Sequence, residues 1–289
     1  MSEQKPPRWD LSNVYPSLSS KKYSDDLAKL KKLIKEQDAF LDKLLATTDG
    51  TTSTEVLAKS AGEVIERSNA ILMIRWTMLA YLESFVTTDT YNKEALAKHS
   101  EFDQVAVGVD KIEVKIRTWV GRVADRLNSF VDKDVIAKAH RYFLEESAKA
   151  SHYLMSDKEE MLAADLSLSG STAWTKLQSA VTSQHSVPFE INGKIQRLPM
   201  PALINLHSHP DEEVRRKAYE AENQAWNTLK EPLAACMNGI KGEVNTLNKR
   251  RGREDCLQSA IEISHIDRET LEAMLSAMKD SFPMFRKYW

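Results

Sequence analysis

Glycine and proline are scarce in this sequence, with nine of each among 289 residues. Sandwiches and barrels of short strands need frequent turns, and tight turns are built largely from these two residue types. Their scarcity argues against such folds and favours long helices.

Cysteine is scarcer still, because Cys236 and Cys256 are the only two. Two cysteines do not make a disulfide framework. Cys236 lies within a stretch of helical periodicity, where a buried thiol behaves as a small apolar side chain. We therefore expect neither cysteine to bind zinc or to act in catalysis.

The sequence also lacks an excess of charge of one sign. Lysine and arginine number 40 against 42 aspartates and glutamates, so no basic field attracts a phosphate backbone and nucleic acid is not an expected partner. The first ten residues lack the apolar core of a signal peptide, and no window approaches 18 uninterrupted apolar residues. The sequence therefore predicts a cytoplasmic protein without a membrane partner.

Apolar side chains recur every three or four residues over most of the chain, which is typical of amphipathic helices. The predicted fold class is all-α, with long antiparallel helices and one small β-hairpin. The spacing predicts helices over residues 21–45, 54–85, 90–119, 134–149, 202–207, 210–252 and 254–262, and further helices that begin near Ser156, Ser171 and Ile266. The first three should form an antiparallel arm, because short loops connect them.

Two expectations concern burial near the N-terminus. Residues 1–20 should be an extended segment that docks on the helices through four anchors: Trp9, Leu11, Val14 and Tyr15. In helix 54–85 the inward stripe begins at Val56, and residues 71–81 are apolar nearly all round. That part of the helix should therefore be buried on several sides.

The periodicity changes in the segment VPFEINGKIQRLP, residues 187–199. Apolar and polar residues alternate there around Asn192-Gly193, the strongest short signal for a hairpin. The sequence predicts strands at residues 187–191 and 194–198.

The longest helix should run from Pro210 to Gly252. Ser208 can cap its first turn with Asp211 at the reciprocal position, and Gly252 can end it in the left-handed conformation. Pro232 should bend it, because proline removes one backbone donor and its ring meets the preceding turn. Its expected inward stripe is Val214, Ala218, Ala221, Ala225, Leu229, Leu233, Met237, Ile240, Val244 and Leu247.

Histidine offers no pair with the spacing of a zinc peptidase, which needs two imidazoles four residues apart with a glutamate beside the first. Seven histidines occur, none is followed by glutamate and none is spaced by four: His99, His140, His152, His185, His207, His209 and His265. The pair His207-x-His209 is best interpreted as a turn with His209 beside a helix cap. No catalytic, cofactor-binding or metal-binding residue is therefore predicted in this chain.

Other polar stretches also have structural interpretations. Three acidic pairs are expected on solvated helix faces or at helix N-termini: Glu145-Glu146, Glu159-Glu160 and Glu212-Glu213. Residues 167–172 are rich in hydroxyls but lack the spacing of a phosphate loop, so a tight helix crossing is expected. The basic run over residues 249–253 suits the negative end of the long helix.

Several runs resemble one known family. They are WDLSNVYPS near the start, SLSGSTAWTKL and RLPMPALINL in the middle, then PLAACMNGIKGEVNTLNKRRG and IDRETLEAMLSAMKDSFPMFRKYW. In this order they resemble the oligoendopeptidase F branch of the M3 zinc metallopeptidases over most of the chain.

The resemblance implies an almost entirely helical bowl with a deep channel. Enzymes of this family hydrolyse internal bonds of short unfolded peptides, with zinc held by HExxH and a further glutamate downstream. HExxH does not occur in these 289 residues, so the zinc ligands are expected beyond Trp289. No site residue of the family is carried onto this chain, which is predicted to be inactive alone.

The resemblance divides the chain into four parts. They are an N-terminal arm over residues 1–20, a helical arm over 21–125, an oligopeptidase F N-terminal-type domain over 126–186, and the start of the catalytic domain over 187–289. The apolar segment from Ile266 to Trp289 should be an unfinished part of that domain, so the missing catalytic half is an expected partner. A stand-alone helical scaffold or peptide-binding module without catalysis remains the alternative.

The first testable prediction concerns the metal. The purified chain should retain no stoichiometric zinc after dialysis and should not cleave peptides, because it lacks the ligand pair and the general base. Elemental analysis and a fluorogenic peptide assay measure both. One tightly bound zinc per chain, lost when His207 or His209 is changed, would show that this pair is a metal site.

Overall fold

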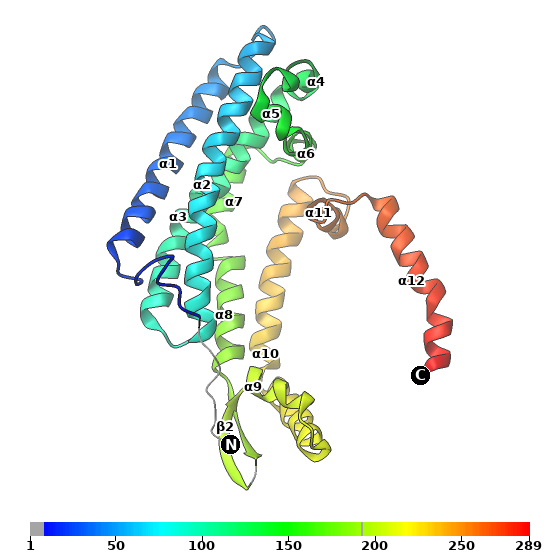
Figure 1. Ribbon diagram of the computed structural model, residues 1–289. Helices are drawn as coiled ribbons and strands as arrows, with labels where there is room; N and C mark the ends of the chain where they lie inside the picture. Colours follow the sequence, from blue (N-terminus) through cyan, green and yellow to red (C-terminus); the bar gives the residue numbers. More distant parts are fainter. Residues whose placement is uncertain (1–8, 192) are drawn as a thin grey trace.

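A computed structural model describes residues 9–191 and 193–289. Its largest part is an arm of three long antiparallel helices (Figure 1), α1 (Lys21–Thr47), α2 (Thr54–Thr88) and α3 (Lys93–Arg122). Each begins after a side chain whose oxygen accepts the backbone N–H three residues ahead: Ser20, Ser53 and Asn92. The predicted long antiparallel helices are confirmed.

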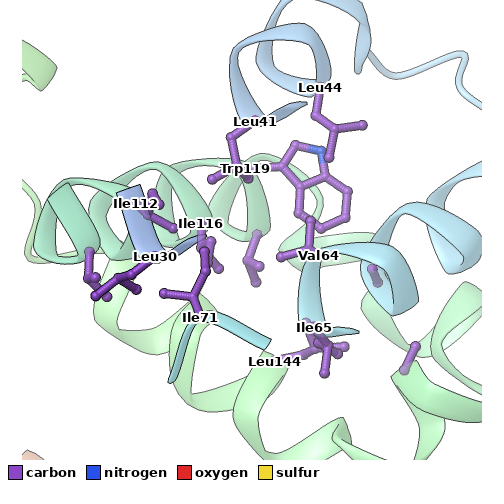
Figure 2. Close-up of a cluster of buried hydrophobic side chains, with 14 of the residues drawn as sticks. Leu30, Leu41, Leu44, Val64, Ile65, Ile71, Ile112, Ile116, Trp119 and Leu144 are labelled. Carbon is purple, nitrogen blue, oxygen red and sulfur yellow. The ribbon is translucent and has the colours of Figure 1, made fainter. Parts of the chain in front are cut away.

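One hydrophobic cluster, here called the arm cluster, holds these helices together and extends to α6. Trp119 is fully buried in it and donates its indole N–H to the Thr48 hydroxyl at 3.0 Å. Figure 2 shows the side chains that meet around it: Leu30, Leu41, Leu44, Val64, Ile65, Ile71, Ile112, Ile116 and Leu144. Each contributes about 1.5–3 kcal/mol by leaving water, so this cluster supplies most of the apolar burial.

Three expectations about burial on α2 and before α1 are wrong. Trp9 is 90% exposed, although Tyr15 docks as expected and packs edge-on against Tyr81. Val56 is exposed, and so are Met73 and Trp76 in the stretch expected to be buried on several sides. The neighbouring helices leave the side of α2 that carries Met73 and Trp76 uncovered, so an apolar circumference did not mean burial all round.

Helix α2 is also long and apolar enough to cross a membrane, with a mean hydropathy of 1.2 in its most apolar window. The core helix of a bundle can have the same composition. Here Ile71, Met78 and Leu82 of α2 are buried in the arm cluster.

Short helices close the far end of the arm. They are η1 (Ala124–Arg126), α4 (Leu127–Phe130), η2 (Val131–Lys133), α5 (Val135–Ala139) and α6 (Arg141–Ser151). The helix predicted over residues 134–149 is therefore two helices. They meet at His140, whose backbone leaves the helical region with φ −111° and ψ 25°.

Helices α7 (Asp157–Ser167) and α8 (Ser171–Gln184) follow, end to end along α3 (Figure 1). Helix α7 begins directly after Ser156, as predicted, and a capping box of Ser156 with Glu159 is present at its start. Gly170 separates the two helices, and α8 begins at Ser171 as predicted.

The predicted hairpin is confirmed as β1 (Ser186–Ile191) and β2 (Lys194–Pro199), paired antiparallel with Phe189 opposite Gln196. Gly193 has φ +73°, as a tight turn requires; Asn192 lies outside the described residues. Then come α9 (Met200–Asn205) and η3 (Leu206–Ser208). Phe189, Met200 and Leu203 form a second buried cluster with Ala218 and Ala225 of the next helix, here called the hairpin cluster.

The long helix is α10 (Glu212–Arg250). Its N-cap is Asp211 and not Ser208, because the Asp211 side chain accepts the Glu213 N–H at 2.9 Å. Its C-terminus matches the prediction: Gly252 has φ +73°, and the Arg253 N–H returns to the Asn248 carbonyl at 3.0 Å. Pro232 lies inside the helix, and Figure 1 shows its yellow and orange parts running in different directions.

After Pro232 the buried face of α10 differs from the predicted stripe. Met237 and Val244 are exposed, whereas Cys236 is 1% exposed and Asn248 is buried. The reason is packing against α8: the absent side chain of Gly239 makes room for the Trp174 ring. The face turned to α8 is therefore the one that carries Cys236 and Gly239.

The chain ends with α11 (Cys256–Ile263) and α12 (Arg268–Tyr288). In the loop between them, His265 has φ +52°, a conformation that favours glycine, and its ring packs edge-on against Tyr142 with the ring centroids 5.7 Å apart. Helix α12 projects away from the rest of the molecule (Figure 1), and no residue in it is buried.

The second prediction tests the buried face of α10 with two neighbouring residues. Cys236→Asp should lower the free energy of unfolding by several kcal/mol, because it places a carboxylate without a partner in an apolar site. Met237→Asp is the matched control and should change stability by about 0.5 kcal/mol or less. Urea unfolding followed by circular dichroism measures both, and equal midpoints would show that the face is assigned wrongly.

Candidate functional site

The two histidines of the only close pair point to different partners. His207 Nε2 lies 2.8 Å from Glu222 Oε2, and the indole N–H of Trp226 donates to the other oxygen of Glu222. His209 Nδ1 instead accepts the backbone N–H of Asp211 at 3.1 Å, beside the cap of α10. The turn interpretation of this pair is confirmed. Within residues 9–191 and 193–289, no three His, Cys, Asp or Glu side chains are grouped as a metal site requires.

An open hollow beside His207 is lined by Glu212, Arg215, Arg216 and Tyr219. The guanidinium of Arg215 donates to two backbone carbonyls, those of His209 and Pro210. Arg216 is held between Glu213 and Glu220 by contacts of 2.6 Å. The charge of Arg216 is therefore already paired with carboxylates, whereas Arg215 is bonded to neutral carbonyl oxygens.

A second hollow lies between α2 and α5, where Gly62 faces Asp134. The Asp134 carboxylate caps α5 by accepting the N–H groups of Ile136 and Ala137, each at 2.9 Å. A side chain on Gly62 would clash with this carboxylate. The glycine is therefore explained by helix packing.

Residues 167–172, which are rich in hydroxyls, lie where helices cross, as expected. A carboxylate that is distant in the sequence also binds there. Glu243 of α10 accepts the backbone N–H of Ser171 and, at 2.9 Å, its hydroxyl. A carboxylate on the free amides at a helix start is stabilising. Glu243 thus fixes the N-terminus of α8 on α10.

Glu160 lies in the first turn of α7, which is one of the two places expected for the acidic pairs, but it is buried and not solvated. Its side chain is 1% exposed and binds Arg251, with the shorter contact at 2.6 Å, and it also accepts the Met155 N–H at 3.1 Å. Burial raises the pKa of Glu160, but Arg251 and the Met155 amide outweigh it and hold the pKa below its usual value. Arg251 therefore joins α10 to α7, beyond its role at the helix terminus.

A group of four charged side chains, here called the His99 cluster, lies where α2, α3 and α8 meet. His99 Nε2 is 2.9 Å from Glu83 Oε1, and its Nδ1 is 3.1 Å from Asp103 Oδ2. Lys176 of α8 approaches the same Oδ2 at 2.5 Å. Sequence reasoning missed this cluster, although the i, i+4 spacing of His99 and Asp103 on a helix was a signal.

The cluster shifts the titration of its members. The hydrogen bond with Asp103 raises the pKa of His99 against the effect of burial, and Glu83 raises it further. Burial raises the pKa of Asp103, but His99 and Lys176 outweigh it and hold the pKa below its usual value. Titratable groups with shifted pKa values are found in catalytic sites and in structural ion pairs alike.

The largest candidate for binding is the apolar side of α12. Its members recur at helical spacing and are all at least partly exposed: Leu271, Met274, Leu275, Met278, Phe282 and Phe285. This set is called the α12 face below. Burial would contribute about 1.5–3 kcal/mol for each large side chain, and a contiguous exposed patch of this kind marks an interaction surface.

Known proteins resemble this chain over different lengths. Residues 124–185, from η1 to the end of α8, match the family described as Oligopeptidase F. Oligopeptidase PepF of Bacillus subtilis (strain 168) is 22% identical over 167 residues, which are 57% of this chain and 25% of that protein.

The fold resembles two solved structures. Oligoendopeptidase-F from Enterococcus faecium matches with a TM-score of 0.75 at 14% identity, over 93% of this chain and 52% of that one. A putative peptidase from Chlamydophila abortus matches with a TM-score of 0.53 at 16% identity, over 97% of this chain and 46% of that one. The chain thus spans about half the length of these solved proteins and a quarter of the curated relative.

The third prediction concerns the junction of α7 and α10. Arg251→Gln should lower the free energy of unfolding by about 3 kcal/mol, because it leaves Glu160 buried without its charged partner. The matched control is Arg250→Gln, which removes an exposed ion pair with Glu159 and should cost about 1 kcal/mol or less. Chemical denaturation at neutral pH measures both.

The loss in free energy of unfolding caused by Arg251→Gln should become smaller as pH falls. A carboxyl whose pKa is depressed in the folded state stabilises the fold above its unfolded pKa, and this stabilisation is lost as pH falls through the folded pKa. The free energies of unfolding of Arg251→Gln and Arg250→Gln should therefore converge in acid. A constant difference between them down to the acid limit would contradict the role of the Glu160 charge.

Proposed function

This chain is related to the N-terminal region of the M3 oligoendopeptidase F family, and we propose that it forms one wall of the peptide channel in a zinc-dependent peptidase of that type. The complete enzyme would hydrolyse internal bonds of short, unfolded peptides in the cytoplasm. The channel would be wide enough for extended peptides and too narrow for folded proteins.

The residues of this chain do not fit a zinc ion. His207 and His209 are engaged by Glu222 and by the Asp211 amide. In peptidases of this class two histidines of HExxH hold zinc, and the glutamate activates the bound water. Those groups would have to come from a catalytic region outside these 289 residues, and this chain would contribute binding surface and rigidity.

The observation that carries the proposal is the uncovered α12 face. Phe282 is 46% exposed and Phe285 is 52% exposed, which is unfavourable for side chains of this size unless another surface covers them. Met237 and Val244 extend the exposed apolar surface onto α10. A catalytic region that packs on both helices would bury these residues and place its metal beside the wall.

The fourth prediction starts from the gene. The reading frame should continue past the Trp289 codon and encode HExxH, and the longer polypeptide should cleave a fluorogenic octapeptide with zinc bound. In that polypeptide Phe282→Asp should lower the activity by weakening the interface, whereas Glu272→Gln, on an exposed polar residue, should leave it unchanged. A stop codon directly after Trp289 would contradict the proposal.

Hydrogen exchange tests the same idea on the 289-residue chain. Amides of residues 282–289 should exchange faster than those of residues 234–247, because α12 has no buried side chain to protect it. Equal protection in a monodisperse monomer would remove the physical support for a missing partner. A stand-alone helical scaffold or peptide-binding module would then be the better account.

A further inference from the structure

Helix α8 lies between the arm and the part of the molecule formed by the hairpin and α10, and it belongs to the hydrophobic cluster of neither. No residue of α8 belongs to the arm cluster or the hairpin cluster, and none of residues 171–184 is buried. Hydrogen bonds and an ion pair connect α8 to the arm. Lys176 contacts Asp103 and Ser100, and Gln184 bonds with Thr90 and Tyr91. These contacts of α8 with α3 and with the loop before α3 are called the α3–α8 seam below.

Both ring nitrogens of His99 face carboxylates across hydrogen-bonding distances, Glu83 on α2 and Asp103 on α3. A neutral imidazole donates through one nitrogen only, whereas an imidazolium donates through both. The arrangement therefore suits the charged ring. When the proton leaves, one of the two carboxylates must face a lone pair.

Lys176 and His99 share one oxygen. Asp103 Oδ2 is 2.5 Å from Lys176 Nζ and 3.1 Å from His99 Nδ1. The two cations repel each other, so a charged His99 weakens the hold of Asp103 on Lys176. Without the His99 charge, Lys176 has no competing cation at Asp103, and its attraction to this carboxylate increases.

We propose that the protonation state of His99 controls which helices are held together. The charged ring binds Glu83 of α2 and Asp103 of α3. When the ring loses its proton, the bond between Asp103 and Lys176 strengthens and tightens the α3–α8 seam. The arm and the α8–α10 unit would then be held more firmly as pH rises past neutrality. The charged groups that face His99 are Glu83 from α2, Asp103 from α3 and Lys176 from α8. The device lies within this chain and stands independently of peptide hydrolysis.

The two effects of the proton have opposite signs. His99 has a folded pKa raised above its unfolded value of about 6.5, so its stabilising bonds to Glu83 and Asp103 are present below that value and are lost as pH rises through the folded pKa. The bond between Asp103 and Lys176 strengthens over the same interval. Because linkage is reciprocal, removing the Lys176 charge must make His99 easier to protonate.

Nuclear magnetic resonance of the histidine rings tests this linkage. Lys176→Met should raise the pKa of His99 by on the order of half a unit, as expected for loss of a neighbouring like charge, and Glu83→Gln should lower it. His99→Gln identifies the resonance, and exposed His152 serves as the internal reference. An unchanged or lower pKa in Lys176→Met would overturn the proposal.

Distance measurements between spin labels test the seam itself. In a Cys256→Ser background, labels at Asn69→Cys on α2 and Asn245→Cys on α10 occupy exposed positions on either side of it. The distance distribution should narrow as pH rises through the His99 pKa. In His99→Gln it should be narrow at every pH, whereas His152→Gln should behave as the unmodified chain does.

Two results would reject the mechanism. One is a distribution in the unmodified chain that does not change with pH, and the other is a pH-dependent change that persists in His99→Gln. Circular dichroism establishes that each variant keeps its helices. Should His99→Gln fail to fold, the ring titration of Lys176→Met still decides, because it leaves His99 and both of its carboxylates in place.

Discussion

The structure depends on directional polar contacts around α8, because this helix joins two hydrophobic clusters and belongs to neither. Glu243 holds its first turn, Lys176 its middle and Gln184 its end. Ion pairs of this kind contribute little net stability, since desolvation offsets much of their attraction. These contacts form only within a narrow range of distances and angles. The contacts around α8 therefore define where the two clusters lie more than how stable each one is.

The features that could be predicted from the sequence are those set by near neighbours along the chain. The capping box of Ser156 with Glu159 spans four residues, and the left-handed end of α10 at Gly252 involves six. The hairpin is likewise set by alternation around its turn. Such signals locate the ends of helices and strands within a few residues because the decisive interactions are local.

The features that could not be predicted depend on partners far away in the sequence. Glu243 meets Ser171 from 72 positions away, and Glu160 meets Arg251 from 91. Of the His99 cluster, only the spacing to Asp103 was visible on one helix. Periodicity identifies an apolar face, but it does not say which neighbour covers that face. Hence Trp76 was expected inside and is exposed, while Cys236 took the buried place expected for Met237.

The left-handed residue His265 determines where α12 departs from α11. That backbone conformation costs a non-glycine residue roughly 1–2 kcal/mol, and stacking on Tyr142 returns an energy of similar size. Covering the α12 face would contribute on the order of 10 kcal/mol. The energy that fixes the backbone at His265 is thus small compared with the energy available from covering the α12 face. A surface that covered α12 would therefore supply more energy than the His265 conformation costs, and such docking could reset the direction of the helix.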